Sequence, residues 1–268
     1  MRRLFGEPYR EQYYAGMYID FSALFHRSSK DHTDKGAVRI ATDSQDWPKE
    51  WKTTYYKSYG NLPQIVLPLE PHKADFFELI ENRHSSRDFT GTPVGLEKLS
   101  AHLKYSCGIV REGDGYAARA QPSGGARFPL EVYALVFSGN TSLPAGVYHY
   151  SVREHALDVL TERSFSKKDI ATLFAYDWIQ EASGAIIITS NFWRNQIKYG
   201  ERGYRYVLLE AGHIGQNVYL ASQALGLGCC AMGGSRDEAI EKLLDIDGIS
   251  ESLVHTVILG EAGSATMK

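Results

Sequence analysis

Apolar side chains recur every three or four residues along the longest periodic stretch of the chain, residues 203–226. This spacing gathers them on one side of an α-helix. The stretch is broadly apolar, which is typical of a helix buried against a sheet or a second subunit. Gly226 and Gly228 come at its end and favour a helix stop. The pattern therefore predicts one long, buried helix.

Shorter helices are predicted on both sides of it. Helical spacing marks a segment ending near Phe25, a segment that opens after Asp75, and residues 95–107 and 236–244. Runs rich in β-branched and aromatic residues predict strands at 130–137, 146–150, 156–160, 185–190, 229–234 and 253–260. Helices that interleave with strands indicate an α+β or α/β chain.

Two stretches lack such periodicity. Residues 1–68 are irregular and aromatic-rich, and their last part, 47–68, reads as extended and is punctuated by prolines. We expect residues 1–68 to be an N-terminal extension that packs on a core domain, residues 69–268. Glycines and two prolines in 111–129 predict a loop.

Composition excludes several classes of protein. Of 268 residues, 43% are hydrophobic and 23% are charged, which is ample for a globular core. The net charge of -3 argues against a broad nucleic-acid-binding surface. No apolar run is long enough for a membrane span or a signal peptide. Three sparse cysteines, at 107, 229 and 230, are simplest as reduced thiols, so we expect a cytoplasmic protein.

The first segment with candidate chemistry is 83–87, at the end of a predicted helix. Arg83 and Arg87 supply planar, permanently charged forks, and Ser85 between them adds a hydroxyl donor. Such a set can surround a phosphate. The alternative is a solvated basic helix end, matched to the helix dipole.

The second segment is a glycine loop, Pro122-Ser123-Gly124-Gly125, which continues as Ala-Arg-Phe-Pro. Adjacent glycines let the backbone approach a ligand closely, and exposed amides there can bond the edge of a flat heterocycle. The alternative is an ordinary connection into the next strand. A phosphate P-loop is excluded because its lysine and its serine or threonine are missing.

Two further segments stand near the long helix. In Cys229–Gly234 no second cysteine pair or spaced histidines accompany the thiols, so we predict buried core thiols rather than a metal site. Lys198 and Tyr199 precede the helix. A desolvated lysine can act as a base and a tyrosine can relay a proton, although such a pair is more often surface decoration.

Together and in order, these segments resemble the nitroreductase superfamily and its SagB-type dehydrogenase branch, the azoline oxidases. The motif RxSxRxF lies at 83–89, QPSGGARFPLEVY at 121–133 and RGYRYVLLEAGHIGQNVYLASQALGLG at 202–228. The resemblance covers about 25–260. It implies an α+β fold with a central mixed or antiparallel sheet flanked by helices.

The resemblance also implies a homodimer with FMN at the interface. Arg83, Ser85 and Arg87 would hold the phosphate and ribityl chain. Pro122, Ser123, Gly124 and Gly125 would line the isoalloxazine from the partner subunit, and Met232 and Gly233 would lie by the flavin N5. Members often carry one more basic phosphate ligand near the C-terminus. Lys268 or Arg236 would serve here, or neither.

The activity implied is oxidation of thiazoline or oxazoline rings in a ribosomal peptide to thiazole or oxazole, with Lys198 and Tyr199 as catalytic residues. Dioxygen would reoxidise FMN, and a cyclodehydratase complex would supply the substrate. One alternative is an NAD(P)H-dependent nitroreductase or ene-reductase of the same fold. Another is a non-catalytic scaffold in a peptide-modifying complex.

Overall fold

The computed structural model describes residues 21–30, 44–113 and 116–263. Contacts divide the chain into two units, Met1–Asp46 and Trp47–Lys268. The described part of the first unit holds helix α2, Phe21–Ser28, and the short 3-10 helix η2, Ser44–Asp46. The helix expected near Phe25 is therefore present and continues for three more residues.

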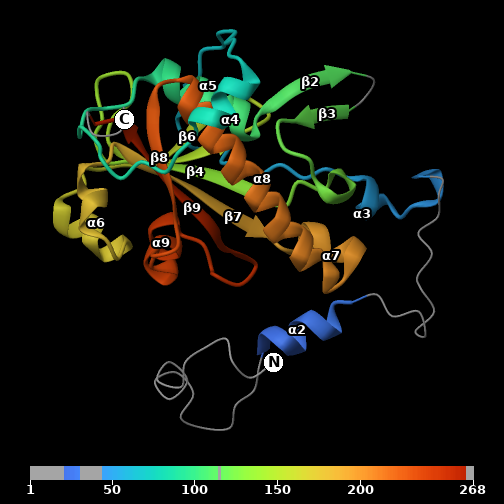
Figure 1. Ribbon diagram of the computed structural model, residues 1–268. Helices are drawn as coiled ribbons and strands as arrows, with labels where there is room; N and C mark the ends of the chain where they lie inside the picture. The colour runs from blue at the N-terminus through green and yellow to red at the C-terminus, as the bar shows by residue number, and fades with distance from the viewer. Residues whose placement is uncertain (1–20, 31–43, 114–115, 264–268) are drawn as a thin grey trace, which may run out of the picture. The chain divides into compact units, whose positions relative to one another are not determined.

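The second unit is built on one seven-stranded sheet of order β1-β6-β5-β4-β7-β9-β8 (Figure 1). Every neighbouring pair is antiparallel, which confirms the α+β class and resolves the sheet as antiparallel. The strands are β1 Gln64–Val66, β4 Leu130–Val136, β5 Gly146–Ser151, β6 Ala156–Glu162, β7 Gly184–Asn191, β8 Leu227–Met232 and β9 Glu251–Glu261.

Helices cover both faces of this sheet (Figure 1). On one face, α5 Leu96–Cys107 and α8 Arg202–Ala224 pack in the core cluster that contains Val132 and Ala134 of β4. On the other, α6 Lys167–Leu173 and α9 Asp237–Leu244 pack with Tyr133 and Leu135. Successive residues of a strand point to opposite faces, so a strand covered on both faces reads as a continuous apolar run. The residues of β4 are all buried, so this strand is recognisable in the sequence as an apolar run.

The predicted long helix is α8, which begins and ends within two residues of the expected bounds. Two seven-residue helices were not predicted. Helix α6 has only seven residues, and so does α7, Trp193–Tyr199, which Gly200 separates from α8 with a positive φ of 54°. Helices of two turns are too short to show a clear apolar period.

The loop predicted at 111–129 is partly wrong. Residues Ile109–Gly113 and Tyr116–Arg119 form strands β2 and β3, which pair as a separate antiparallel hairpin. Strand β2 is exposed after its first residue, so it lacks the half-buried alternation by which strands are recognised. The extended reading of 47–68 also misses a helical turn, α3 Lys49–Lys52, although it includes β1, which joins the main sheet.

Helix α4, Phe76–Asn82, begins at Asp75, whose carboxylate accepts a hydrogen bond from the amide of Glu78 at 3.0 Å. This is the N-cap that an aspartate at this position favours. Among the described residues, none of the helices is long and apolar enough to cross a membrane.

Candidate functional site

The turn after α4 carries the basic motif. Arg83 caps the helix, and the amide of Ser86 donates to the carbonyl of Cys229 on β8 at 2.8 Å. Ser86 is buried, whereas Ser85 and Arg87 are exposed. The backbone bond therefore fixes the turn on the edge strand of the sheet and leaves two predicted phosphate ligands facing outward.

Tyr219 of α8 joins this turn to the end of β8. Its hydroxyl lies 2.8 Å from Oγ of Ser85 and accepts a 2.8 Å hydrogen bond from the amide of Ala231. The guanidinium of Arg83 stacks on its ring, 5.3 Å from the centroid. The structure thus brings Arg83 and Ser85 beside the residue that precedes Met232. Sequence reasoning missed Tyr219, which lies within the stretch 202–228 that resembles the family but is only partly buried and has no marked chemistry of its own.

Met232 and Gly233 end β8. The Met232 side chain is buried in the core cluster that also holds Phe89 and Ile258. A Cβ placed on Gly233 would meet nothing within 4 Å. The end of this strand therefore presents open backbone beside the basic turn, as a close approach to a ligand requires.

The glycine loop forms a single 3-10 turn, Gly124–Ala126. Gly125 has φ +65°, and a Cβ there would overlap Oη of Tyr199 and lie 3.2 Å from Nζ of Lys198. Ala126 and Phe128 also adopt positive φ, at 52° and 46°. Positive φ in residues with a Cβ costs about 1–2 kcal/mol each and tends to occur at functional sites. The loop is thus held in one strained shape against Lys198 and Tyr199.

Lys198 is enclosed by aromatic rings rather than exposed. It is 8% accessible, and its ammonium lies 3.4 Å from the ring centroid of Trp47 and 5.7 Å from that of Trp51. Burial, with the nearby charge of Arg127, lowers the pKa of Lys198. Burial raises the pKa of Tyr199. The surface-decoration alternative is therefore excluded for Lys198, and its environment suits a lysine base.

Two side chains, those of Trp51 and Arg127, hold the helix that carries Lys198. The indole of Trp51 donates to the carbonyl of Ile197 at 3.2 Å, and Nε of Arg127 donates to that of Arg194 at 2.9 Å. The other end of the Arg127 guanidinium donates to the carbonyls of Trp51 and Thr53, each at 2.8 Å. Arg127 is fully buried, so the loop, α7 and residues 51–53 are fastened together through one side chain.

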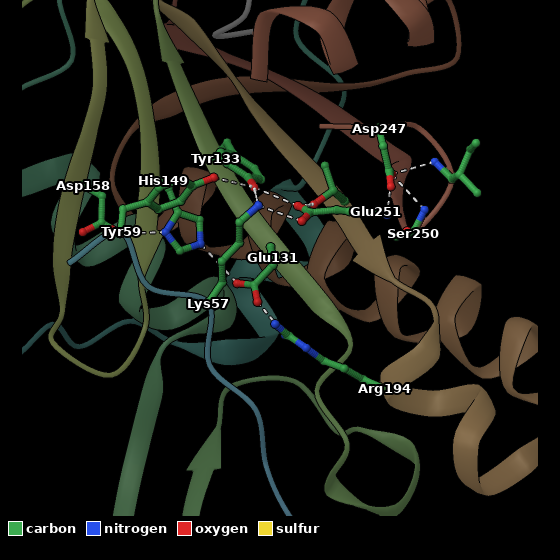
Figure 2. Close-up of polar contacts among 12 residues, drawn as sticks. Lys57, Tyr59, Glu131, Tyr133, His149, Asp158, Arg194, Asp247, Ser250 and Glu251 are labelled. Carbon is green, nitrogen blue, oxygen red and sulfur yellow. Dashed lines mark hydrogen bonds and ion pairs between the residues drawn. The ribbon is translucent and has the colours of Figure 1, made fainter. Parts of the chain in front are cut away.

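A buried ionic chain supports α7 from the sheet (Figure 2). Arg194 pairs with Glu131 on β4, whose carboxylate lies 3.2 Å from His149 on β5, and His149 lies 2.8 Å from Asp158 on β6. Burial alone would lower the pKa of His149, but its hydrogen bonds to Asp158 and Glu131 raise it above the ordinary value. A second, partly buried group, in which Lys57 and Tyr133 bond Glu251, lies beside it. The scattered histidines of the sequence gave no sign of this network.

The two parts of the predicted site lie at opposite ends of α8. Ser85 contacts Tyr219, and Gly124 lies against Tyr206, where a Cβ would be 3.5 Å from the ring. Thirteen residues separate these tyrosines on one helix, which is about 20 Å at 1.5 Å per residue. Within one chain, the glycine loop therefore contacts Lys198 and Tyr199 near the start of α8. The basic turn and the end of β8 meet separately, near the end of α8.

The cysteines are free and buried, as expected. Burial raises the pKa of Cys107 to about 12 and that of Cys229 to about 11, which excludes both as thiolate nucleophiles. Within the described residues, no cluster of histidine, cysteine or carboxylate side chains could hold a metal ion. Of the two candidates for a C-terminal phosphate ligand, Arg236 is exposed before α9, and Lys268 lies outside the described residues.

Comparison with known proteins supplies the family. The nitroreductase family profile matches residues 80–261. MJ1384 of Methanocaldococcus jannaschii, a protein named as a nitroreductase, is 32% identical over 188 residues, 70% of this chain and 92% of its own. The trifolitoxin-processing protein TfxB of Rhizobium leguminosarum is 34% identical over 219 residues, 77% of this chain and 59% of its own.

The microcin B17-processing protein McbC of Escherichia coli is 32% identical over 143 residues, which is half of each chain. This chain thus spans only 59% of TfxB and 50% of McbC. These two relatives confirm the resemblance to the SagB-type branch that the sequence motifs indicate.

Solved structures show the same fold. A nitroreductase from Anabaena variabilis superposes with a TM-score of 0.68 at 24% identity, covering 93% of this chain and 48% of its own. A chain of the E. coli microcin synthetase McbBCD, solved with truncated pro-MccB17 bound, gives 0.58 at 16% identity, covering 96% and 87%. A nitroreductase from Exiguobacterium sibiricum, solved with FMN, gives 0.50 at 14% identity, covering 73% and 91%. With a family profile over more than half of its length, and with MJ1384 and TfxB as relatives, this chain belongs to the nitroreductase family.

Proposed function

We propose that this protein is an FMN-dependent oxidoreductase. The donors of its basic turn, two guanidinium groups and a hydroxyl, have the chemistry that a phosphate and a ribityl chain require. The backbone at Gly233 is open, since a Cβ there would meet nothing within 4 Å, and Gly125 brings the glycine loop directly against Tyr199 and Lys198. Arg83, Ser85 and Arg87 would bind the phosphate end, and Pro122–Gly125, Met232 and Gly233 would surround the isoalloxazine. A family member of known structure also binds FMN.

We further propose that the working unit is a homodimer, since each chain holds the two halves of the site about 20 Å apart along α8. The glycine loop of one subunit would then complete the site begun by the basic turn of its partner. Exposed apolar side chains on α4 and α8 support such an interface: Phe76, Phe77, Leu208 and Leu209 are 57%, 73%, 44% and 61% accessible. Leu209→Glu should yield a monomer that loses FMN.

The reaction that the site supports best is oxidation of an azoline ring in a peptide. The observation that carries this proposal is the buried, aromatic-enclosed Lys198 directly against the glycine loop. Aromatisation of a thiazoline or oxazoline removes one proton and one hydride. A lysine of lowered pKa can accept the ring proton at Nζ, and Tyr199 beside it can orient the ring. FMN, when bound, supplies the hydride acceptor.

The relatives favour a peptide substrate. TfxB and McbC are named for processing trifolitoxin and microcin B17, and a structural neighbour belongs to a synthetase complex with a pro-peptide bound. We therefore propose that the protein acts on a precursor peptide, together with the cyclodehydratase that makes its azolines. Dioxygen would be the final electron acceptor.

The test compares wild type with Lys198→Ala and with Lys168→Ala, which removes an exposed lysine of α6. Each protein is incubated with an azoline-containing peptide, and the loss of two mass units per ring is followed by mass spectrometry. We expect Lys198→Ala to stay yellow and slow azole formation at least 100-fold, the lower range for loss of a general base, while Lys168→Ala matches wild type. Unchanged azole formation in Lys198→Ala would refute the catalytic assignment.

A second candidate is an NAD(P)H-dependent nitroreductase, which the name of MJ1384 favours. The two functions differ in the reductive half-reaction. Rapid bleaching of the flavin on stopped-flow mixing with NADPH would support the reductase. Slow bleaching together with active azole formation would support the oxidase.

A further inference from the structure

A buried carboxylate lies beneath the glycine loop. Glu210 projects from α8 and is 2% accessible. Its Oε2 accepts a hydrogen bond from Oγ of Ser123 at 2.6 Å, and its Oε1 accepts a longer one from Nε2 of Gln121 at 3.4 Å. The glutamate therefore supports the predicted flavin-lining loop through two side-chain hydrogen bonds. No sequence motif singled it out, because it occupies one of the buried positions of the helix.

The hydroxyl of Ser123 is fully used in this arrangement. It accepts a hydrogen bond from the amide of Phe128 at 2.9 Å and gives its single proton to Glu210. A serine hydroxyl has one donor hydrogen. While Glu210 is ionised, Ser123 consequently has no proton to offer to a ligand above the loop, although its side chain is only half-buried.

The surroundings of Glu210 do not hold its charge firmly. Arg119 of β3 is the charged group that acts on it from a distance, and within the described residues no salt bridge reaches Glu210. The Arg119 guanidinium lies instead between two rings, 5.2 Å from the centroid of Tyr56 and 4.5 Å from that of Phe128. In the described part of the chain, two buried atoms of these neighbours, Nε of Arg119 and Oε1 of Gln121, have no hydrogen-bond partner.

Burial therefore dominates the titration of Glu210. It raises the pKa of this carboxyl to about 7, against the opposing effects of Ser123, Gln121 and Arg119. A buried carboxylic acid of this kind exchanges its proton in the physiological range. Neutral Glu210 becomes a donor where ionised Glu210 is only an acceptor.

We propose that Glu210 is a positioning residue whose protonation reverses the Ser123 hydrogen bond and turns the Ser123 hydroxyl into a donor toward the ligand on the glycine loop. In the protonated form Oε2–H donates to Oγ of Ser123, the Phe128 amide bond is kept, and the serine proton points outward. One proton is taken up, and one donor is gained at the ligand face. This inference rests on the proposed function, because the ligand it invokes is the heterocycle of FMN.

The first measurement needs no cofactor. In difference infrared spectra of the purified apoprotein, the carbonyl band of a protonated carboxyl should be present at pH 6 and lost by pH 8.5. The band should be missing in Glu210→Gln and retained in Glu238→Gln, which changes an exposed glutamate of α9. A wild-type spectrum without this band at pH 6 would overturn the proposal.

The second measurement is the dissociation constant of FMN from pH 6 to 9, by quenching of flavin fluorescence. The phosphate of FMN has a pKa near 6, and its titration affects wild type and variants alike. The dissociation constant of each variant is therefore divided by that of wild type at the same pH. One hydrogen bond is worth about a factor of ten in affinity. We expect wild type to lose about tenfold in affinity between pH 6 and 8.5, relative to Glu210→Gln.

Ser123→Ala should lose the same pH dependence while leaving Glu210 in place, which keeps the test valid if Glu210→Gln folds poorly. Glu238→Gln should follow wild type at every pH. A constant ratio of wild type to both site variants across this range would overturn the inference. Failure of wild type to bind FMN at any pH would instead overturn the proposed function, and this inference with it.

Discussion

Nε of Arg127, in the glycine loop, donates to the backbone carbonyl of Arg194 on α7 at 2.9 Å. The bond joins the loop predicted to line the flavin with the helix that carries Lys198. Since the same guanidinium also holds the carbonyls of Trp51 and Thr53, three separate segments depend on one buried side chain. The position of Lys198 relative to the loop is therefore set by Arg127.

Arg127→Met should lower the free energy of unfolding by about 3 kcal/mol, because three carbonyls, one of them fully buried, lose a charged donor. Each such bond contributes roughly 1.5–3 kcal/mol before the cost of burying the side chain is subtracted. Urea denaturation followed by circular dichroism measures the change. The matched control is Arg153→Met, whose guanidinium is exposed, and which should change stability by less than about 0.5 kcal/mol. Equal effects of the two substitutions would contradict the role of Arg127.

The charge of Arg127 should also be felt at Lys198. Burial is the main cause that lowers the pKa of Lys198, and the positive charge of Arg127 lowers it further. Removing that charge should therefore raise the pKa of Lys198. We expect a higher pKa in Arg127→Met than in Arg127→Lys, which loses the fork but keeps the charge. NMR titration of the Lys198 Cε resonance in ¹³C-lysine-labelled protein gives both values. The same pKa in the two variants would exclude this electrostatic coupling.

The buried histidine predicts a dependence of stability on pH. His149 has a raised pKa in the folded protein, so its charge stabilises the fold fully below the unfolded value of about 6.5 and less as pH rises through the folded value. Glu131 and Asp158 have lowered pKa values and stay ionised over this range. The difference in unfolding free energy between wild type and His149→Gln should therefore shrink from pH 6 to pH 9. A constant difference would show that His149 is not charged in the fold.

The two loop glycines should respond differently to alanine. Gly125→Ala places a Cβ at φ +65° and against Oη of Tyr199, so we expect a loss of about 2 kcal/mol in stability and weaker FMN binding. Gly124→Ala meets only an ordinary contact with the Tyr206 ring at 3.5 Å and should cost less than about 0.5 kcal/mol. Thermal unfolding of the apoprotein separates them, and similar melting temperatures would disprove the conformational requirement at Gly125.

Local patterns in the sequence were sufficient for most of the fold. Helix α8 is long enough for its buried residues to repeat every three or four positions. Strands β4 and β7 are covered on both faces and therefore read as continuous apolar runs. The hairpin of β2 and β3 and the short helices α6 and α7 escaped prediction. Few of their residues are buried in a regular order, so packing and turn geometry decide them instead of periodicity.

The candidate site divides in the same way. Arginine, serine and glycine types marked the basic turn and the loop, and the order of the motifs pointed to the family. Their partners came only from the tertiary structure: Ser85 meets Tyr219 across 134 residues, and Ser123 meets Glu210 across 87. The burial of Lys198 under Trp47 likewise has no trace in the neighbouring sequence. A residue's own chemistry is written in the chain, but its desolvation and its hydrogen-bond partners depend on which distant segments the fold brings into contact.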